Sequence, residues 1–335
     1  MQISVVIPTC NRKARLLSLL QNLDQSSYPI YEVIVVDSGE NKLSIAEYSP
    51  FKNLCIQYVQ SKKSVCIQRN IGIRTASSDW IFLCDDDIEI GSDYLEKLVF
   101  HVNLNPKAGA VSGLWLQKEK GEWTAKYPEQ STLRIIWKFF FQLSVWGEIR
   151  CNSNNFLLKI ISHFYTKRGN HISKAGWPVI TDFSGKYFTT PVYSLGASII
   201  KKDWLLQSPF DEVLDRHGIG DNYGVIADFP DPNVHVVTNA FAYHHHEVLN
   251  RLQKPLQYYR RAIALDYFTK TKKRLKKIKK VWLLWSLTGN LLEFIISGNK
   301  IMVKPALKSI WKIAMSRNPY YVAAQQSKKI EEIFL

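Results

Sequence analysis

WIFLCDDD (residues 80–87) joins an apolar run, typical of a buried strand, to three consecutive aspartates. Open α/β sheets bind ligands beyond the carboxyl ends of their strands. Hard divalent cations are held in such places by one or two carboxylates together with substrate phosphates. Adjacent carboxylates repel one another unless a cation or hydrogen-bond donors compensate. A solvated acidic turn would have the same composition, so the surrounding sequence must decide between a site and a turn.

Strands and helices alternate on both sides of this stretch. The residue patterns predict strands at 3–8, 32–36, 54–59, 79–84 and 109–116, and helices at 12–23, 64–76 and 92–103. Asn11 and Ser92 are the expected caps of two of these helices. Such alternation is typical of a mostly parallel sheet with flanking helices, so we expect an α/β fold.

The rest of the chain is less regular. Residues 121–188 are rich in aromatics and predict loops and short helices that cover a site. The later patterns predict strands at 192–200, 234–237 and 240–243, a short helix at 202–206, a loop leading into a helix at 218–228, and helices beyond 251, the last at about 305–316. We therefore expect a helical appendage after the sheet.

Composition narrows the choice of partner and compartment. The formal net charge of +15 predicts an anionic partner. The five cysteines are widely spaced and include no Cys-x-x-Cys pair, which indicates a reducing compartment rather than a disulfide frame or zinc site. No secretory signal and no run long enough to span a membrane is visible, so we expect a cytoplasmic protein.

Most of the excess charge lies near the carboxyl terminus. Residues 251–280 contain twelve basic residues and one acidic residue, Asp266. Lys270 to Lys280, followed by the apolar 281–292, indicates an interfacial anchor on the anionic inner face of a membrane. A solvated helix beside a packed one is the alternative. The basic run lacks a stacking platform or helix-turn-helix pattern, so we do not expect nucleic-acid binding.

Three polar features are expected at one edge of the sheet. The first strand runs into Pro8-Thr9-Cys10-Asn11-Arg12, a turn and helix start whose backbone N–H groups suit phosphate or ribose. Asp37 ends the second strand, and Asp85 and Asp87 follow the fourth. Each feature alone fits an ordinary turn or cap. Three at the same edge indicate a ligand site.

Four segments, in this order and spacing, resemble the family-2 glycosyltransferases with the GT-A fold: Val5 to Arg12, Val35 to Gly39, Arg69-Asn70-x-Gly72, and Phe82 to Asp87. The resemblance covers Met1 to about Gly113, continues more loosely to His246 and does not reach the last helices. It implies a Rossmann-like GT-A domain at 1–250, with a nucleotide-binding half at 1–113 and an acceptor and catalytic half at 114–250. The region 251–335 would be the helical appendage.

The resemblance implies a role for each matching residue. Pro8, Thr9 and Arg12 would border the nucleotide of the donor, and Asp37 would bind its base or ribose. Arg69 would lie near the diphosphate.

The acidic trio would hold the donor and a Mg²⁺ or Mn²⁺ ion. Asp85 and Asp87 would form the family's Asp-x-Asp pair, with Asp87 on the metal, Asp85 toward the ribose or metal, and Asp86 among the donor-binding residues. His244 is a candidate third metal ligand, since neutral imidazole binds metals well. His246, on the same face of the expected strand, is the alternative.

A base is needed to take the proton of the acceptor hydroxyl. Family members usually have a Glu-Asp pair beyond a Phe-Asp-Glu segment; here Phe210-Asp211-Glu212 is present, but the pair has become Gly220-Asp221. We assign Asp221 as the base, with Asp215 as the rival. A helix-capping aspartate would show the same pattern.

The implied reaction moves a sugar, with inversion, from a nucleotide-diphosphate sugar to a hydroxyl of a lipid-linked or polysaccharide acceptor. Gly196 and Ala197 would lie beneath the donor sugar, although a tight strand would also use small residues. A non-catalytic nucleotide-sugar-binding or scaffold protein is the alternative, because the glutamate before Asp221 is missing. A nucleotidyltransferase would need a glycine-rich basic loop after the first strand, which Pro8 to Asn11 is not.

Overall fold

The computed structural model describes residues 1–119, 121–125, 131–149, 155–245 and 252–333. The chain divides into two compact units. The first unit consists of Met1–Ala125, Gly185–Glu212 and Arg216–Arg251, and the second of Lys126–Ser184, Val213–Asp215 and Leu252–Leu335.

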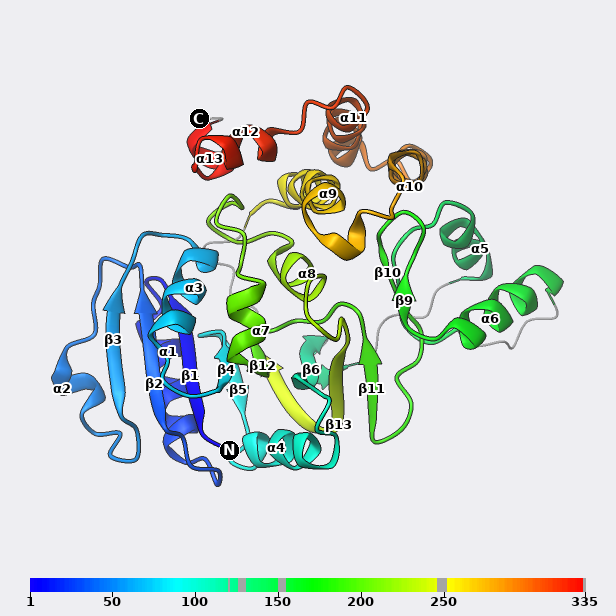
Figure 1. Cartoon of the computed structure of the whole chain (residues 1–335). Coiled ribbons are helices and arrows are strands. Elements are labelled where there is room, and N and C mark those ends of the chain that lie inside the picture. The colour runs from blue at the N-terminus through cyan, green and yellow to red at the C-terminus, as the bar shows by residue number, and fades with distance from the viewer. Residues whose placement is uncertain (120, 126–130, 150–154, 246–251, 334–335) are drawn as a thin grey trace. The chain divides into compact units, whose positions relative to one another are not determined.

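One sheet of ten strands forms the frame of the first unit within the described residues (Figure 1). The main order is β11-β13-β6-β12-β4-β1-β2-β3, with β5 beside β13 and β7 beside β6. The strands are β1 (Ile3–Thr9), β2 (Glu32–Asp37), β3 (Ile56–Gln60), β4 (Trp80–Cys84), β5 (Ile88–Ile90), β6 (Ala110–Glu119), β7 (Glu122–Thr124), β11 (Tyr187–Thr190), β12 (Ala197–Lys201) and β13 (Val234–His244). The strands β1 to β4 pair in parallel, so their carboxyl ends meet at one edge.

Helices cover both faces of the parallel strands. The helices of this unit are α1 (Lys13–Asp24), α2 (Ile45–Tyr48), α3 (Val65–Thr75), α4 (Tyr94–Leu104), α7 (Lys202–Gln207) and α8 (Asp221–Ile226). Successive side chains of a strand point to opposite faces. Accordingly Val5 and Ile7 join the core that contains the buried leucines of α1 and the apolar face of α4. Val6 faces the other way and meets Gly72 of α3.

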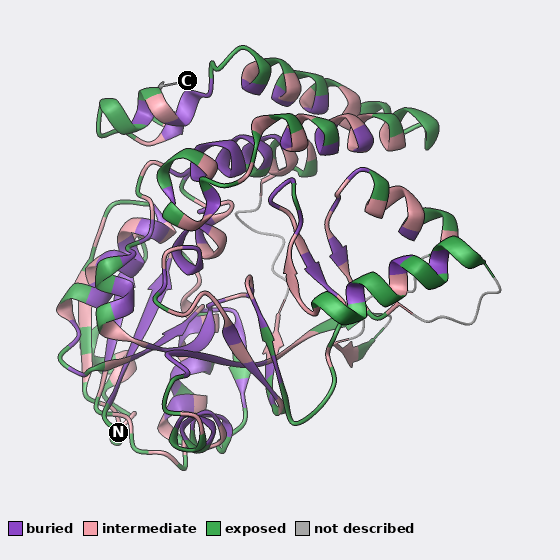
Figure 2. Ribbon diagram, turned by 45° about the vertical axis from the view of Figure 1, so that its right-hand side comes forward, coloured by how far each residue is buried: buried purple, intermediate pink, exposed green. Residues whose placement is uncertain are grey.

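The second unit is mainly helical. It contains α5 (Thr132–Phe140), α6 (Phe156–Arg168), α9 (Lys254–Thr271), a 3₁₀ helix (Lys273–Leu275), α10 (Lys280–Ile296), α11 (Lys300–Ala314), α12 (Pro319–Gln325) and α13 (Ile330–Ile333). A small sheet has the order β8 (Val145–Trp146), β10 (Pro178–Ile180) and β9 (His171–Ile172). Buried and exposed residues alternate along the helices of this unit (Figure 2).

The α/β architecture is the predicted one, but several local predictions were wrong. The strand expected at 192–200 begins at Ala197, and the two strands expected at 234–243 are one strand, β13, whose register shifts between Val237 and Phe241. The segment 121–188 holds α6, a helix of 13 residues, besides its loops. The last long helix begins at Lys300 and contains Pro305.

The two expected caps are also wrong. Arg12 and Asp93 occupy the cap positions of α1 and α4. Asn11 instead adopts a left-handed backbone, and its side-chain oxygen accepts a hydrogen bond from the N–H of Glu40 at 2.9 Å. It therefore ties the turn after β1 to the turn after β2.

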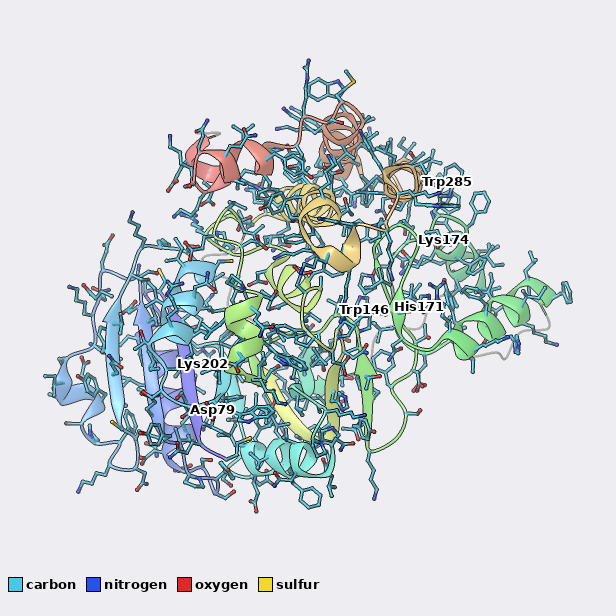
Figure 3. All side chains as sticks on the ribbon, viewed as in Figure 1. Asp79, Trp146, His171, Lys174, Lys202 and Trp285 are labelled. Atoms are coloured by element: carbon cyan, nitrogen blue, oxygen red, sulfur yellow. The ribbon has the colours of Figure 1, made fainter. Side chains whose placement is uncertain are left out.

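The segment expected to anchor the protein is only partly exposed. Leu283 and Leu287 of α10 are buried inside the second unit, so they are not available to lipid. Trp285 stays 37% exposed beside α5 (Figure 3), where its indole N–H donates to the carbonyl of Phe140 at 2.9 Å. None of the helices in the described part of the chain has the length and apolar content needed to cross a bilayer.

Candidate functional site

The acidic trio follows β4 at the edge where the parallel strands end. Asp86 is buried, and its carboxylate accepts hydrogen bonds from the hydroxyl of Thr9 at 2.7 Å and the guanidinium of Arg12 at 2.8 Å. Arg12 also donates to Asp87 at 3.1 Å. The turn after β1 and the turn after β4 are therefore joined by charge-assisted hydrogen bonds, as two strands that are neighbours in the sheet allow.

The middle aspartate has a perturbed proton affinity. Burial raises the pKa of Asp86 to about 6, and the charge of Asp87 acts in the same direction, while Arg12 and Thr9 oppose the shift. Its enclosure by protein donors suits a role in holding the turn together. Asp86 stays a predicted donor-binding residue, and its side chain points at Thr9 and Arg12, two others of that group.

The pairing of β5 with β13 brings a histidine to Asp87. The chain turns after the trio into β5, which pairs antiparallel with the end of β13 so that Ile88 lies opposite His244. The Nε2 atom of His244 lies 3.5 Å from Oδ2 of Asp87. The predicted pair is thus adjacent, whereas His246 lies outside the described residues.

These two side chains fit a divalent cation. Carboxylate and imidazole are both ligands of Mn²⁺-type ions, whose other positions are commonly filled by water and substrate phosphates. In the part of the chain that the structure describes, no three His, Cys, Asp or Glu side chains gather as a complete metal site. A cation held by Asp87 and His244 would therefore need further ligands from water or a substrate.

One buried guanidinium joins the two other key carboxylates. Arg69 of α3 is only 4% exposed; one of its amino groups donates to Asp85 at 2.5 Å and the other to Asp221. Burial alone would lower the pKa of Arg69, but the charges of Asp85 and Asp221 outweigh it and raise that pKa. The candidate base thus lies one side chain away from the trio. Sequence analysis had placed Arg69 near a diphosphate.

The Arg-Asn-x-Gly segment of α3 acts as a unit. The Asn70 amide donates to the carbonyl of Phe210 and to the Glu212 carboxylate, both at 2.9 Å, and accepts from the N–H of Phe210 at 3.0 Å. The guanidinium of Arg69 lies 5.1 Å from the centre of the Phe210 ring. At Gly72 a Cβ atom would collide with Val6 of β1. The glycine lets the helix lie against the sheet, and this places Arg69 and Asn70.

Asp221 is held by its own loop as well as by Arg69. It is the first residue of α8, after Gly220, whose φ of 97° suits glycine. Its Oδ1 accepts from the N–H of Asn222 at 2.6 Å, and its N–H donates to the carbonyl of Gly218 at 2.9 Å. Gly218, at φ 63°, has no room for a Cβ atom, which would lie 2.9 Å from Oδ2 of Asp221. The two glycines therefore let this loop close around the carboxylate.

Gly196 and Ala197 lie directly beside Asp85. The N–H of Asp85 donates to the carbonyl of Gly196 at 2.8 Å, and Ala197 pairs with Cys84 across β12 and β4. A Cβ atom on Gly196 would collide with the Asp85 carboxylate. The small residue is thus required for Asp85 to occupy its position.

Asp37 ends β2 at the same edge. Its carboxylate accepts from the N–H of Gly39 at 2.7 Å and from the hydroxyl of Tyr58 on β3. The Gln68 amide of α3 donates to the carbonyls of Thr9 and Val36, each at 2.7 Å. Sequence analysis missed Tyr58 and Gln68, because a tyrosine in a strand and an amide in a helix carry no recognisable motif. Asn70 lies in a recognised segment, but its hydrogen bonds to Phe210 and Glu212 were not predicted.

Two predicted site residues remain, Pro8 and Asp215, and they lie in different units of the chain. Pro8 lies in β1 opposite Val36, next to Thr9 and at the same edge. Asp215, the rival base, is completely buried and clusters with the second unit. The structure thus brings the trio, Thr9, Arg12, Arg69, Gly196, Asp221 and His244 into one network of contacts.

Comparison with known families identifies the first half of the chain. The model of Glycosyl transferase family 2 matches residues 4–166, just under half of the sequence. This segment of the chain is similar to glycosyl transferase family 2. The match runs from β1 into α6, includes Thr9, Arg69 and the acidic trio, and stops before Asp221.

Curated relatives agree over a similar segment. The chain is 30% identical over 109 residues to an uncharacterized glycosyltransferase of Haemophilus influenzae and 33% identical over 99 residues to the uncharacterized glycosyltransferase YwdF of Bacillus subtilis. These matches cover 32% and 29% of this chain and 37% of each relative. A chondroitin synthase of Pasteurella multocida is 39% identical over 94 residues, 26% of this chain and 9% of its own length. The chain thus spans little more than a third of the length of the first two.

Solved structures extend the likeness in fold to nearly the whole chain. Residues 1–349 of S. aureus TarS superpose with a TM-score of 0.52 at 13% identity, over 98% of this chain and 92% of TarS 1–349. The same protein in complex with UDP-GlcNAc gives 0.53 at 12% identity, over 98% and 93%. The GT-A fold that sequence analysis predicted is confirmed.

Proposed function

We propose that the protein is an inverting glycosyltransferase that moves a sugar from a nucleotide-diphosphate sugar to a hydroxyl group. The observation that carries the proposal is the Arg69 bridge, because it sets the candidate base Asp221 next to the first aspartate of the Asp-x-Asp pair. The match of residues 4–166 to the family model and the relatives described as glycosyltransferases support the reaction class.

The donor would lie across the edge formed by β1, β2 and β4. Asp37, Pro8, Thr9 and Arg12 stand at the strand ends where nucleotides bind in open sheets. Gly196, with no side chain of its own, leaves the Asp85 carboxylate partly accessible at 27% exposure. Ala197 is buried behind it.

Asp87 and His244 would hold Mg²⁺ or Mn²⁺ at this edge, with Asp85 as a further ligand. Such a cation, when bound, stabilises the negative charge that develops on the leaving diphosphate. Arg12 and Arg69 keep the carboxylates of the trio in place without it, since both guanidinium groups donate to them. The protein therefore presents a preorganised charge arrangement before substrate arrives.

Asp221 would act as the general base. Its carboxylate takes the proton of the acceptor hydroxyl as that oxygen bonds to the anomeric carbon from the side opposite the diphosphate. The bond from the anomeric carbon to the diphosphate oxygen breaks at the same time, its electron pair leaves with the nucleoside diphosphate, and the configuration inverts. Arg69 and the N–H of Asn222 orient the carboxylate, which answers how Asp221 is held without the usual preceding glutamate.

We further propose a lipid-linked or polysaccharide acceptor and a location on the cytoplasmic face of a membrane. The basic carboxy-terminal region supports an anionic surface as partner. The membrane contact itself is argued below.

The function is tested by a donor screen followed by two variants. Nucleotide sugars are screened with Mn²⁺ by thermal shift, because a ligand of the native state raises the melting temperature. With the donor so found, Asp221→Asn should lower sugar transfer at least about 100-fold, since general bases contribute about that much, while donor affinity stays within about twofold. Asp87→Ala should abolish the Mn²⁺-dependent part of donor binding, and EDTA should do the same to the unsubstituted protein.

Asp203→Asn, an exposed aspartate of α7, is the matched control and should retain full activity. Undiminished transfer by Asp221→Asn would remove this residue from the base role. Donor binding without any turnover, hydrolysis included, would instead support a non-catalytic binding protein.

A further inference from the structure

The outer face of α11 combines exposed apolar and cationic side chains. At the helical spacing of about 100° per residue, one side of α11 carries seven of them. Ile301 is 73% exposed, and the other six are Leu307, Trp311, Met315, Lys300, Lys304 and Lys308. Figure 2 shows this outer side as mostly exposed.

The opposite side of α11 already provides the packing of the helix. Ala306, Ser309 and Ile313 are buried there, and α11 lies against α9 and α10. The outer apolar side chains are therefore not needed to hold α11 in place, whereas the Lys308 ammonium lies 4.9 Å from the centre of the Tyr259 ring of α9. Leu307, Trp311 and Met315 are 51%, 48% and 54% exposed, and apolar groups gathered in this way typically mark an interaction surface.

The sequence around this face contains basic residues and no nearby acidic ones. No aspartate or glutamate occurs between Glu293 and Glu331. Lys300, Lys304, Lys308 and Lys312 follow one another at intervals of four, where like charges repel along a helix and destabilise it. The arrangement therefore favours an anionic partner outside the chain.

The aromatic residue of the face lies among cations. The ring of Trp311 has the Lys312 ammonium at 5.1 Å and the Arg317 guanidinium at 5.6 Å. The α10–α11 turn, taken as residues 295–299 and so including the end of α10, adds Ile295 and Ile296, which are 55% and 75% exposed. Tryptophan and isoleucine beside lysine is the composition of helices that lie in a lipid–water interface.

We propose that this face, α11 with the α10–α11 turn, binds the surface of an anionic lipid bilayer. Lysine stems would extend along the acyl boundary while their ammonium groups reach headgroup phosphates, and Trp311 and the isoleucines would enter the boundary region. A second copy of the chain suits the face less, since a symmetric pair would set the same lysines against one another. The inference extends the membrane partner proposed above and moves the contact from 270–292 to α11.

The test is sedimentation of the full chain with vesicles of phosphatidylglycerol and phosphatidylcholine in equal amounts. Each lysine near such a surface is worth about fivefold in affinity, so Lys304→Gln with Lys308→Gln should weaken binding by about 30-fold. Leu307→Ser with Trp311→Ser should weaken it as well. Raising the salt from about 0.1 M to about 1 M should release the protein, because the Debye length falls from about 10 to about 3 Å.

Matched controls come from exposed residues of the first unit. Lys52→Gln with Lys107→Gln removes two exposed lysines, and Phe100→Ser with Leu104→Ser removes two apolar side chains that are 64% and 66% exposed. Both controls should bind vesicles like the unsubstituted chain, and the α11 variants should retain transfer to a soluble acceptor. Lipid binding and sugar transfer are thus measured in separate assays. A result against the membrane proposal leaves the glycosyltransferase proposal standing, and the reverse also holds.

Three results would overturn the inference. The first is that the unsubstituted chain does not bind anionic vesicles at about 0.1 M salt. The second is that the control variants lose as much affinity as the α11 variants. The third is that, without lipid, Leu307→Ser with Trp311→Ser converts a dimer to a monomer in analytical ultracentrifugation, which would identify the face as a contact between copies.

Discussion

Arg69 holds two carboxylates from distant parts of the chain with one planar group. Its two amino groups reach Asp85 and Asp221 separately, a fork geometry that guanidinium provides and ammonium does not. Burial strengthens the arrangement, because an unpaired charge in such a place is costly. Arg69 therefore acts as a positioning residue for the proposed base.

Replacing Arg69 by lysine should separate positioning from donor binding. Lysine keeps the charge but can reach only one carboxylate well, so Asp221 loses its fixed orientation. We expect kcat to fall at least about tenfold, since a misplacement of about 1 Å can cost about 100-fold, with little change in KM for the donor. Steady-state kinetics measures the two separately.

Arg74→Lys on the exposed side of the same helix is the control and should behave like the unsubstituted protein. If KM for the donor rises while kcat is kept, Arg69 instead serves the diphosphate, as sequence analysis expected.

The raised pKa of Asp86 makes a prediction about stability and pH. The folded chain binds the proton of Asp86 more tightly than the unfolded chain does. The contribution of this proton to the free energy of unfolding is therefore fully present below about pH 4 and is lost as pH rises through about 6. Asp86→Asn removes this dependence. The free energy of unfolding of the variant minus that of the unsubstituted protein should therefore increase by up to about 3 kcal/mol from pH 4 to pH 7. Denaturant titrations at both pH values measure the difference, and a constant difference would contradict the assignment.

For single residues, the sequence predicts which residues belong to the site better than it predicts which residues they contact. Asp85, Asp87 and Arg69 are recognisable because their motifs are short and ordered. Their partners are not, since Arg69 and Asp221 are 152 residues apart and no local pattern links them. Tyr58 and Gln68 could not be predicted from the sequence for the same reason. Tyr58 bonds to Asp37, and Gln68 to the carbonyls of Thr9 and Val36, only when the strands and the helix are assembled.

The contact between α3 and β1 is the element-scale feature on which the site rests. Gly72→Ala should destabilise the protein by about 1 to 3 kcal/mol, because the new methyl group collides with Val6 and must lift α3 from the sheet. The better helix propensity of alanine offsets only part of this. The same lift would move Arg69, so transfer should fall as well.

Gly91→Ala is the matched control, because the added Cβ atom would find only the Asp93 carboxylate at 3.4 Å. Its free energy of unfolding should change by less than about 0.5 kcal/mol. Equal unfolding midpoints of the two variants in urea would argue against a close contact at Gly72.

Strands and helices with a regular hydrophobic pattern were predicted correctly. Those whose limits depend on tertiary packing were not. The parallel strands are continuous apolar runs, which explains why β1, β2 and β4 agree closely with expectation. β13 could not be recognised as one strand, because its register shift interrupts the alternation between Val237 and Phe241. In α11, Pro305 suggested a helix start, yet the helix continues through it.

The division into two units reflects contacts that cross long stretches of sequence. Within the second unit, α5 packs on α10 through Trp137, whose indole donates to the carbonyl of Gly289 at 3.3 Å, and through Phe141 and Trp285, whose rings are stacked at 4.8 Å. Residues 126–184 accordingly cluster with the helices beyond 252. Sequence analysis grouped the former with the sheet, because an irregular aromatic segment does not show which core its side chains enter.

The two proposals place two ligands on different units, and hydrogen exchange can test that separation in the whole molecule. A donor at 100 times its dissociation constant stabilises the state that binds it by about 2.7 kcal/mol. Protection against exchange should therefore rise in β1, β4, α3 and α8 of the first unit when donor and Mn²⁺ are added, and stay unchanged in α10 and α11. Anionic vesicles should give the reverse pattern, with slower exchange at the α10–α11 turn. If the donor instead protects α11 as strongly as α3, the two surfaces are energetically coupled, and treating lipid binding and sugar transfer as independent would be wrong.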